Sequence, residues 1–255
     1  AARGEDAKVK SATFFTAQVD FTRSGELLNF IDEHQLKMVE SLASQQGFLD
    51  GRYLALTFNL LRGNDLIWST VNKHYLLGED YPAFDLLHWN GDVTNLPAKW
   101  HKDYLCDLYR DNKLVEPGAL SALGTPIDLR KVTTPTYVQA GREDHIAPVG
   151  SVWKIRDHFQ GPIRFVLAGS GHIAGVVNPP AQGKYQYWLN EDPKVSSLDE
   201  YVEGAVETKG SWWPDWLNWL SGQAPKQVAA KGARQPGEGK LKAIEEAPGS
   251  YVKTR

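Results

Sequence analysis

Apolar residues follow two patterns in this chain, and each pattern predicts a different kind of element. Two short runs, at 136–140 and 163–168, are rich in β-branched and aromatic residues and are bounded by Gly and Pro, which predicts buried strands. Between them, residues 149–159 repeat apolar positions with the 3.6-residue period of an amphipathic helix. Because crossovers of this kind are right-handed, the unit predicts two parallel strands joined by a helix.

The rest of the chain divides into strand-like and helical stretches. Residues 12–20 are aromatic and β-branched, which predicts a further core strand. Helical periodicity then dominates, at 25–44 and at 65–77. Two later helices are predicted at 197–208 and 212–220, the second packing against the sheet through Trp213, Trp216, Leu217 and Leu220.

These patterns predict a core interrupted by an insertion. Strand signals disappear between 24 and 112, which is the size and position of a cap inserted between two strands. Residues 223–239 are rich in Ala, Lys, Gln and Gly and predict a poorly ordered linker. The expected organisation is a core strand region at 1–23, a largely helical cap at 24–112, a second core part at 113–222, and a linker and tail at 223–255.

The predicted cap is rich in aromatic residues. These rings either form a small core of the cap itself, which we take as the default, or line an apolar substrate passage or a subunit interface. They are Phe48, Tyr53, Phe58, Trp68, Tyr75, Tyr81, Phe84, Trp89, Trp100, Tyr104 and Tyr109.

Polar loops follow the two central strands, and they contain the strongest candidates for chemistry. Asp144 follows the first strand, and His172 follows the second, about one strand-helix-strand repeat later. The carboxyl ends of parallel strands meet at one edge of the sheet, so the two side chains can meet. An acid followed by a histidine is the order of the last two triad members in α/β hydrolases. On the pattern alone, purely structural roles are equally open: Asp144 would lie in the N-cap region of a helix, and His172 would be a loop residue that is hydrogen-bonded to the backbone.

The motifs around these residues resemble the C-terminal half of a class I polyhydroxyalkanoate synthase. The resemblance is carried by GREDHI at 141–146, GHIAGVVNPP at 171–180 and GSWWPDW at 210–216, and three further motifs extend it over nearly the whole chain. The further motifs are LRGNDLIW at 61–68, FDLLHWNGDVTNLP at 84–97 and APGSYVK at 247–253.

The resemblance implies an α/β-hydrolase fold with a mostly parallel sheet and an inserted helical cap. It also implies a polymerase of (R)-3-hydroxyacyl-CoA thioesters, with His172 as general base and Asp144 as the acid that orients it or activates the substrate hydroxyl. Glu143 is the competing acid on the same loop. The resemblance further assigns a supporting role to His145, for which a structural role is equally open, and a role near coenzyme A to Arg62 and Asn112.

Partners and location follow from the same resemblance. It implies a growing polyester chain or granule surface as partner, a homodimer, and no cofactor apart from the coenzyme A of the substrate. The remaining histidines show no ligand spacing, so we assign no metal.

Composition narrows the class of protein. The chain has 255 residues, of which 42% are hydrophobic, enough for a substantial core. Its single cysteine excludes an internal disulfide and a cysteine-based zinc site, and its net charge of −3 gives no case for nucleic acid. No apolar run approaches the length of a spanning helix and no signal-peptide pattern is present, so we expect a cytoplasmic protein. The resemblance implies that it is associated with polymer granules.

A nucleophile is missing from these motifs. Neither a G-x-S-x-G nor a G-x-C-x-G elbow occurs, and residues 1–6 begin without Met, so we expect a truncated chain whose nucleophilic Cys lies upstream and which is inactive alone. Cys106 lies in a helical context without flanking glycines, which predicts a structural thiol. The alternatives are an esterase or intracellular polyester depolymerase of the same fold, and a non-catalytic granule-binding module.

Overall fold

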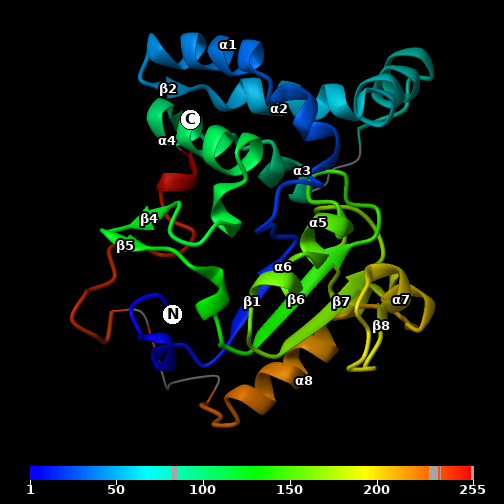
Figure 1. The fold of residues 1–255 in the computed structure, drawn as a ribbon. Helices are drawn as coiled ribbons and strands as arrows, with labels where there is room; N and C mark the ends of the chain where they lie inside the picture. Colours follow the sequence, from blue (N-terminus) through cyan, green and yellow to red (C-terminus); the bar gives the residue numbers. More distant parts are fainter. Residues whose placement is uncertain (82–84, 230–234, 236, 254–255) are drawn as a thin grey trace.

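The computed structural model describes residues 1–81, 85–229, 235 and 237–253. In these residues, helices cover both faces of a five-stranded sheet, and a helical layer lies beyond one end of its strands (Figure 1). The strands, in spatial order, are β1 (Ala12–Phe15), β6 (Thr136–Gly141), β7 (Ile163–Ala168), β8 (Gln186–Leu189) and β9 (Val206–Lys209).

The sheet is mixed, which corrects the expectation of a mostly parallel one. Strand β6 pairs in parallel with β1 and with β7, so that Phe14, Val138 and Phe165 lie side by side. The β7–β8 and β8–β9 pairs are antiparallel. The difference arises after the histidine loop, where the chain returns directly as β8 without the crossover helix that a further parallel strand needs.

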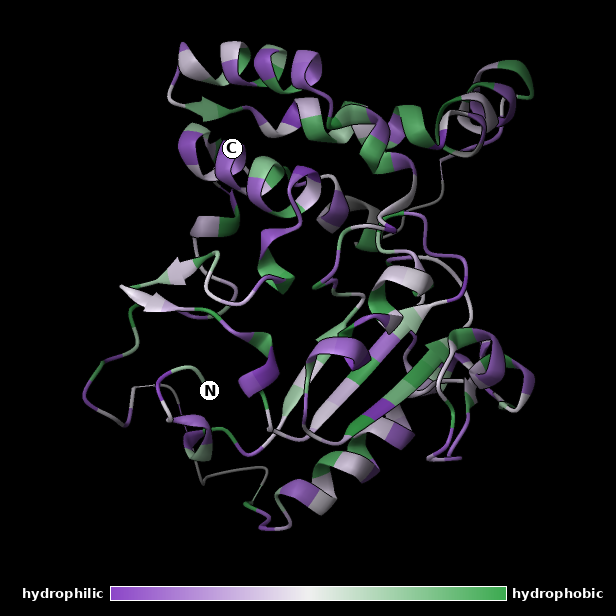
Figure 2. Ribbon diagram, viewed as in Figure 1, coloured by the Kyte–Doolittle hydropathy of each residue, from purple (hydrophilic) through white to green (hydrophobic). Residues whose placement is uncertain are grey.

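The two faces of the sheet bury alternate residues of the same strands. Val138 and Leu167 pack in one cluster with α5 (Val149–Trp153) and α6 (Ile155–His158). Their neighbours Tyr137 and Val166 face the opposite cluster, which includes residues of α8 (Trp213–Gln223). This alternation follows from the period of two in an extended strand. Figure 2 shows the strong apolar character of β7.

Two predicted helices differ in detail. The helix expected at 149–159 is divided into α5 and α6 at Lys154, whose ammonium binds the carboxylate of Asp20. The helix expected at 212–220 is α8, but Leu217 is exposed and Trp219 packs against the sheet in its place.

The prediction of one helix over 197–208 is wrong in its second half. Helix α7 (Leu198–Glu203) begins with a capping box between Ser197 and Glu200 and ends at Gly204. Residues after Gly204 form the edge strand β9, which pairs with β8. The β-branched Val206 and Thr208 favour a strand, and only the pairing partner decides between the two conformations.

A helical layer, residues 25–110, lies between β1 and β6 in the sequence. Its regular elements are η2 (Gly25–Phe30), α1 (Glu33–Ser44), α2 (Gly51–Leu61), α3 (Asp85–Asn90) and α4 (Ala98–Asp103). The antiparallel pair β2 (Phe48–Leu49) and β3 (Leu96–Pro97) joins the segment after α1 to the segment before α4. Residues 65–77, expected as an α-helix, contain the π-helical segments η3 (Asn64–Trp68) and η4 (Val71–Leu76), and a third, η5 (Tyr104–Arg110), follows α4.

Many aromatic rings of the helical layer are exposed, which corrects the expectation that they form its own core. Six of them have between 47% and 76% of their surface exposed: Tyr53, Trp68, Tyr75, Tyr81, Trp89 and Trp100. Tyr109 packs against Phe21 of the core instead. Phe84, which begins the fifth of the six motifs, lies outside the described residues.

Short elements complete the chain. They are η1 (Asp6–Lys8), η6 (Lys113–Val115), the hairpin β4 (Ser121–Ala122) and β5 (Thr125–Pro126), η7 (Leu129–Lys131), η8 (Pro180–Gln182) and η9 (Tyr251–Lys253). Most described residues of the predicted linker at 223–239 lie outside helices and strands, and positions 230–234 and 236 lie outside the described residues. Among the helices that the structure describes, none has the length and apolar character needed to cross a membrane.

Candidate active site

The acid loop begins where β6 ends, at Gly141, and its central residue is Asp144. One carboxylate oxygen, Oδ1, accepts hydrogen bonds from the backbone N–H groups of Ile146 and Ala147, each at 2.8 Å. The other, Oδ2, lies 2.8 Å from Nδ1 of His172. The Asp144 side chain has 0% of its surface exposed. The structure therefore brings Asp144 and His172 together, as the strand order predicted.

The histidine loop is a tight helical turn that begins after β7. The backbone N–H of Gly175 donates to the carbonyl of Gly171 at 2.8 Å, and that of Val177 donates to Ile173 at 2.8 Å. A Cβ atom on residue 175 would lie 2.6 Å from the Gly171 carbonyl oxygen, closer than real contacts allow. Only glycine at position 175 therefore permits the turn that carries His172.

The two loops touch each other at Gly141. A Cβ atom there would lie 3.1 Å from both the Ser170 carbonyl oxygen and the Cβ of Asp144. The backbone N–H of Glu143 also donates to the Ser170 carbonyl at 3.2 Å. This close backbone approach fixes the separation between the acid and the histidine. Glu143, the competing acid, has an exposed side chain, whereas Asp144 binds His172.

The pairing determines which nitrogen of His172 can act as a base. A carboxylate only accepts, so Nδ1 carries the proton that binds Asp144, and Nε2 is the nitrogen that takes up a proton. The imidazole has 31% of its surface exposed and is therefore accessible to a reacting group. The arrangement can perform general acid and base catalysis with the charge of the imidazolium stabilised by Asp144.

His145 lies beside this pair, together with the charge of Arg62. Burial lowers the pKa of His145, and the nearby positive charge of Arg62 lowers it further. Arg62 follows α2, far from Asp144 in sequence, so the fold brings a predicted coenzyme A residue close to the acid loop. His145 is consequently neutral at pH 7, and its Nδ1 has no hydrogen-bond partner within the described part of the chain.

Asn112, the other predicted coenzyme A residue, binds the core. Its Oδ1 accepts from the backbone N–H of Phe21 at 2.9 Å, and its Nδ2 donates to Asp20 at 3.3 Å. Burial raises the pKa of Asp20, but hydrogen bonds from Lys154 and Thr22 outweigh this and hold it at about 2. These contacts join the two ends of the helical layer to each other and, through Lys154, to the helical segment that follows the acid loop.

The other candidate groups lie away from the pair or belong to the packing. Cys106 is part of η5 in the helical layer and is half-buried. Nε2 of His158 lies 3.7 Å from Asp20, within the contacts that hold the core. Among the described residues, no three His, Cys, Asp or Glu side chains are grouped in a way that could hold a metal ion.

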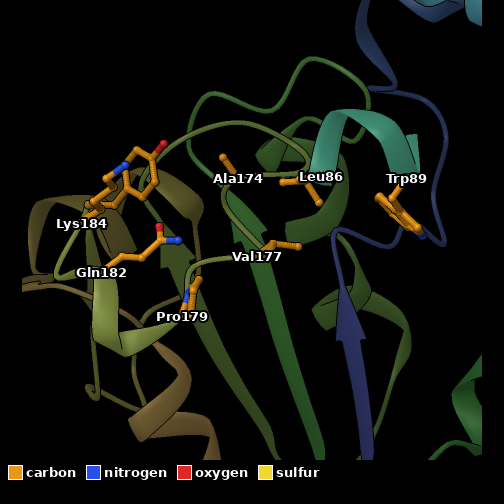
Figure 3. A pocket seen from close by; sticks show the side chains of 8 residues that line it. Leu86, Trp89, Ala174, Val177, Pro179, Gln182 and Lys184 are labelled. Carbon is orange, nitrogen blue, oxygen red and sulfur yellow. The ribbon is translucent and has the colours of Figure 1, made fainter. Parts of the chain in front are cut away.

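A cavity of about 490 Å³ adjoins the histidine loop on the side of the helical layer (Figure 3). Leu86 and Trp89 of α3 line one side, and Ala174 and Val177 of the histidine loop line another. The remaining lining residues are Pro179, Gln182, Lys184 and Tyr185. Its walls are predominantly apolar, with polar groups at Gln182 and Lys184, so it can accommodate an apolar chain that has a polar end.

Sequence reasoning missed two groups of residues that hold the loops. The indole N–H groups of Trp212 and Trp213 bind the backbone of the histidine loop. Gln18 donates to the carbonyl of Ile146 in the acid loop and accepts from Ser151. The sequence could have indicated the role of the tryptophans, because the indole N–H of a buried tryptophan needs a hydrogen-bond acceptor.

The chain was compared with known proteins. No family model matches it. It is 46% identical over its whole length to poly(3-hydroxyalkanoate) polymerase subunit PhaC of Rhizobium meliloti (strain 1021), and 45% identical over 97% of its length to poly(3-hydroxyalkanoate) polymerase of Methylorubrum extorquens. It is 44% identical over its whole length to the PhaC subunit of Cupriavidus necator.

The matched region is only part of each relative. The chain spans 41%, 40% and 44% of the length of these three proteins, respectively. The identity is of this level over all or nearly all of the chain, and the matched region includes the acid and histidine motifs. These two findings identify the family. The chain belongs to the poly(3-hydroxyalkanoate) polymerase family and corresponds to a C-terminal portion of its members.

Proposed function

We propose that this chain carries the acid and the base of an acyltransferase that joins (R)-3-hydroxyacyl groups into a polyester and releases coenzyme A. The observation that carries the proposal is the hydrogen bond between Asp144 and His172, at the carboxyl edge of a sheet in a polymerase-like chain. This bond leaves Nε2 of His172 as the proton acceptor.

In the proposed reaction, Nε2 of His172 takes up and releases a proton twice. Nε2 first takes the proton of a thiol that another part of the polymerase provides, and the thiolate attacks the thioester carbonyl. Coenzyme A leaves as a thiolate, which takes the proton from the imidazolium. The hydroxyl of the next unit then gives its proton to Nε2 and attacks the acyl group, and the ester forms as the departing thiolate recovers that proton. Asp144 stabilises each imidazolium.

The arrangement of the helical layer supports the role of a cap in an α/β-hydrolase fold. Residues 24–112 leave the core after β1 and return before β6, and α3 lies beside the histidine loop (Figure 3). The cavity of about 490 Å³ between α3 and this loop is the passage we propose for the acyl or polyester chain. The proposed core parts are 1–23 and 113–222, with a tail at 223–255.

We propose different roles for Arg62 and Asn112, the two predicted coenzyme A residues. Arg62 lies close enough to His145 to influence its pKa, so we propose that its guanidinium meets the negatively charged coenzyme A substrate. Asn112 acts through the core, because both ends of its amide bind Asp20 and Phe21. His145 supports the acid loop as a neutral side chain.

The proposal includes partners and a location. The working polymerase acts at the surface of a polymer granule, and the exposed aromatic residues of the helical layer supply apolar surface for a second subunit or the polymer. No cofactor is proposed beyond the coenzyme A of the substrate. The names of the relatives favour polymerisation over the hydrolysis and granule-binding alternatives.

The test uses three single variants of the full-length polymerase. His172→Ala and Asp144→Asn should each lower the rate of coenzyme A release from 3-hydroxybutyryl-CoA by about 10² to 10⁴-fold, because a general base contributes about that factor. Glu143→Gln changes a carboxylate on the same loop and should retain most activity. Thermal melting of all three should stay near the parent value. Near-normal turnover in either of the first two variants would refute the assignment.

A further inference from the structure

Three tryptophans at the start of α8 each donate an indole hydrogen bond, and two of the acceptors belong to the histidine loop. Nε1 of Trp212 donates to the carbonyl of Gly175 at 2.8 Å, and Nε1 of Trp213 donates to the carbonyl of Val176 at 2.9 Å. Nε1 of Trp216 donates to Oγ1 of Thr13 in β1 at 3.1 Å.

The two accepted carbonyls end the turn that carries His172. Within this turn, the N–H groups of Gly175 and Val177 bind carbonyls at positions 171 and 173. None of the described backbone N–H groups donates to the carbonyl of Gly175, as is common at the end of a helical turn, whereas the carbonyl of Val176 accepts from the backbone N–H of Asn178 at 3.0 Å. The indole of Trp212 supplies the donor that the Gly175 carbonyl lacks, and the indole of Trp213 adds a second donor to the Val176 carbonyl, so another element caps the turn.

The donors are held in place by the sheet. Trp212 has only 1% of its surface exposed, and its ring packs with Tyr137 of β6 and Phe15 of β1. Further along α8, Asp215 binds Arg164 of β7 and the hydroxyl of Tyr137. The position of α8 is therefore fixed by β6 and β7, the strands that precede the acid and histidine loops.

We propose that Trp212 and Trp213 are positioning residues that hold His172 within hydrogen-bond distance of Asp144. This inference rests on the proposed function, because it matters for catalysis only if His172 is the base. It assigns a physical task to the motif GSWWPDW at 210–216. Loss of either indole N–H loosens the turn and lowers the fraction of molecules in which the Asp144–His172 bond is formed.

The experiment compares Trp212→Phe and Trp213→Phe with the matched control Trp216→Phe in the full-length polymerase. All three remove an indole N–H and the same ring volume at the start of α8. The control removes no hydrogen bond to the histidine loop, although its ring packs against that of Trp212. The first two should lower kcat for coenzyme A release by about tenfold, since one hydrogen bond contributes on the order of a factor of ten, with KM little changed. The control should stay within about twofold.

A second readout is independent of activity. The Nδ1 proton of His172, bound to Asp144, gives a low-field proton NMR signal that disappears in His172→Ala. This signal should weaken or broaden in Trp212→Phe and Trp213→Phe and persist in Trp216→Phe. If Trp212→Phe fails to fold, benzothienylalanine at position 212 alone keeps the ring shape and removes the N–H.

The outcomes separate this inference from the proposed function. An equal kcat and an equal NMR signal in all three tryptophan variants would overturn the positioning role. A weakened signal in a protein whose His172→Ala variant retains turnover would support the positioning role and refute the proposed function.

Discussion

At the scale of single residues, the carboxylate of Asp144 already has its hydrogen-bonding positions largely filled. Two backbone N–H groups bind Oδ1, and His172 binds Oδ2, while none of the side chain is exposed. A substrate hydroxyl would have to displace one of these donors to reach it. The geometry therefore favours orientation of His172 over direct activation of the hydroxyl, two roles between which the sequence could not choose.

Buried His101 gives a prediction about stability against pH. His101 has 4% of its surface exposed, and burial lowers its pKa. A histidine with a lowered folded pKa costs nothing above the unfolded pKa of about 6.5. As the pH falls from there towards the folded pKa, stability is lost, because the unfolded chain takes up a proton that the buried imidazole does not. His101→Gln should therefore lose less stability between pH 7 and pH 5 than the parent. Urea unfolding at both pH values measures this.

The control for His101 is His34→Gln. His34 is exposed on α1, so its replacement should leave the pH dependence of the free energy of unfolding as in the parent. An equal loss of stability in the parent and in His101→Gln would contradict the prediction.

At the scale of elements, the sequence predicted the strands and helices that depend on the local pattern of apolar residues, and it missed those that depend on pairing between distant segments. Strands β6 and β7 and helix α8 followed from apolar runs and periodicity, and their loops followed from strand order. The strand β9 was missed because its residues suit a helix as well, and only contact with β8 selects the strand. Helices α5 and α6 divide at Lys154, which binds Asp20, 134 residues away, and a short-range pattern does not show such a contact.

The attachment of α8 to the sheet gives a prediction with an internal control. Arg164 of β7 binds two carboxylates, Asp215 of α8 and Glu191 in the loop after β8. The side chain of Asp215 is 10% exposed, whereas that of Glu191 is 73% exposed. Asp215→Asn should lower the free energy of unfolding by about 1 to 3 kcal/mol, because it leaves a partly buried guanidinium poorly paired.

The matched change Glu191→Gln should cost less than about 1 kcal/mol, because solvent screens an exposed ion pair. Chemical denaturation of both variants measures the difference. Equal costs would show that Asp215 does not fasten α8 to the sheet.

At the scale of the whole molecule, the sequence indicated an insertion between two strands but not how its surface is used. The exposed Trp68, Tyr75 and Trp89 carry the same apolar signal in the sequence as rings buried in a core. The type of a residue sets the free energy gained when its side chain is buried. It does not show whether the side chain is buried within this chain or against a partner. The sequence also could not predict the cavity beside the histidine loop, because its two sides come from segments far apart in the chain, α3 and residues 174–185.

The contacts of Asn112 have a consequence for how the molecule can be divided. Asn112 and Asp20 are 92 residues apart in sequence and bind each other, so the chain leaves and re-enters the core at one place. Closing a loop costs little more for a long loop than for a short one, about 0.6 kcal/mol for each doubling of its length. A short Gly-Ser linker in place of residues 25–110 should therefore leave the sheet intact in the full-length protein.

Such a shortened protein should unfold cooperatively and keep the low-field proton signal of His172, but it should release no coenzyme A, because Arg62 and α3 are removed. Failure to unfold cooperatively would mean that the core depends on the helical layer. Cooperative unfolding of the shortened protein would show that the insertion is a cassette, which could be exchanged between relatives without redesigning the acid and the base.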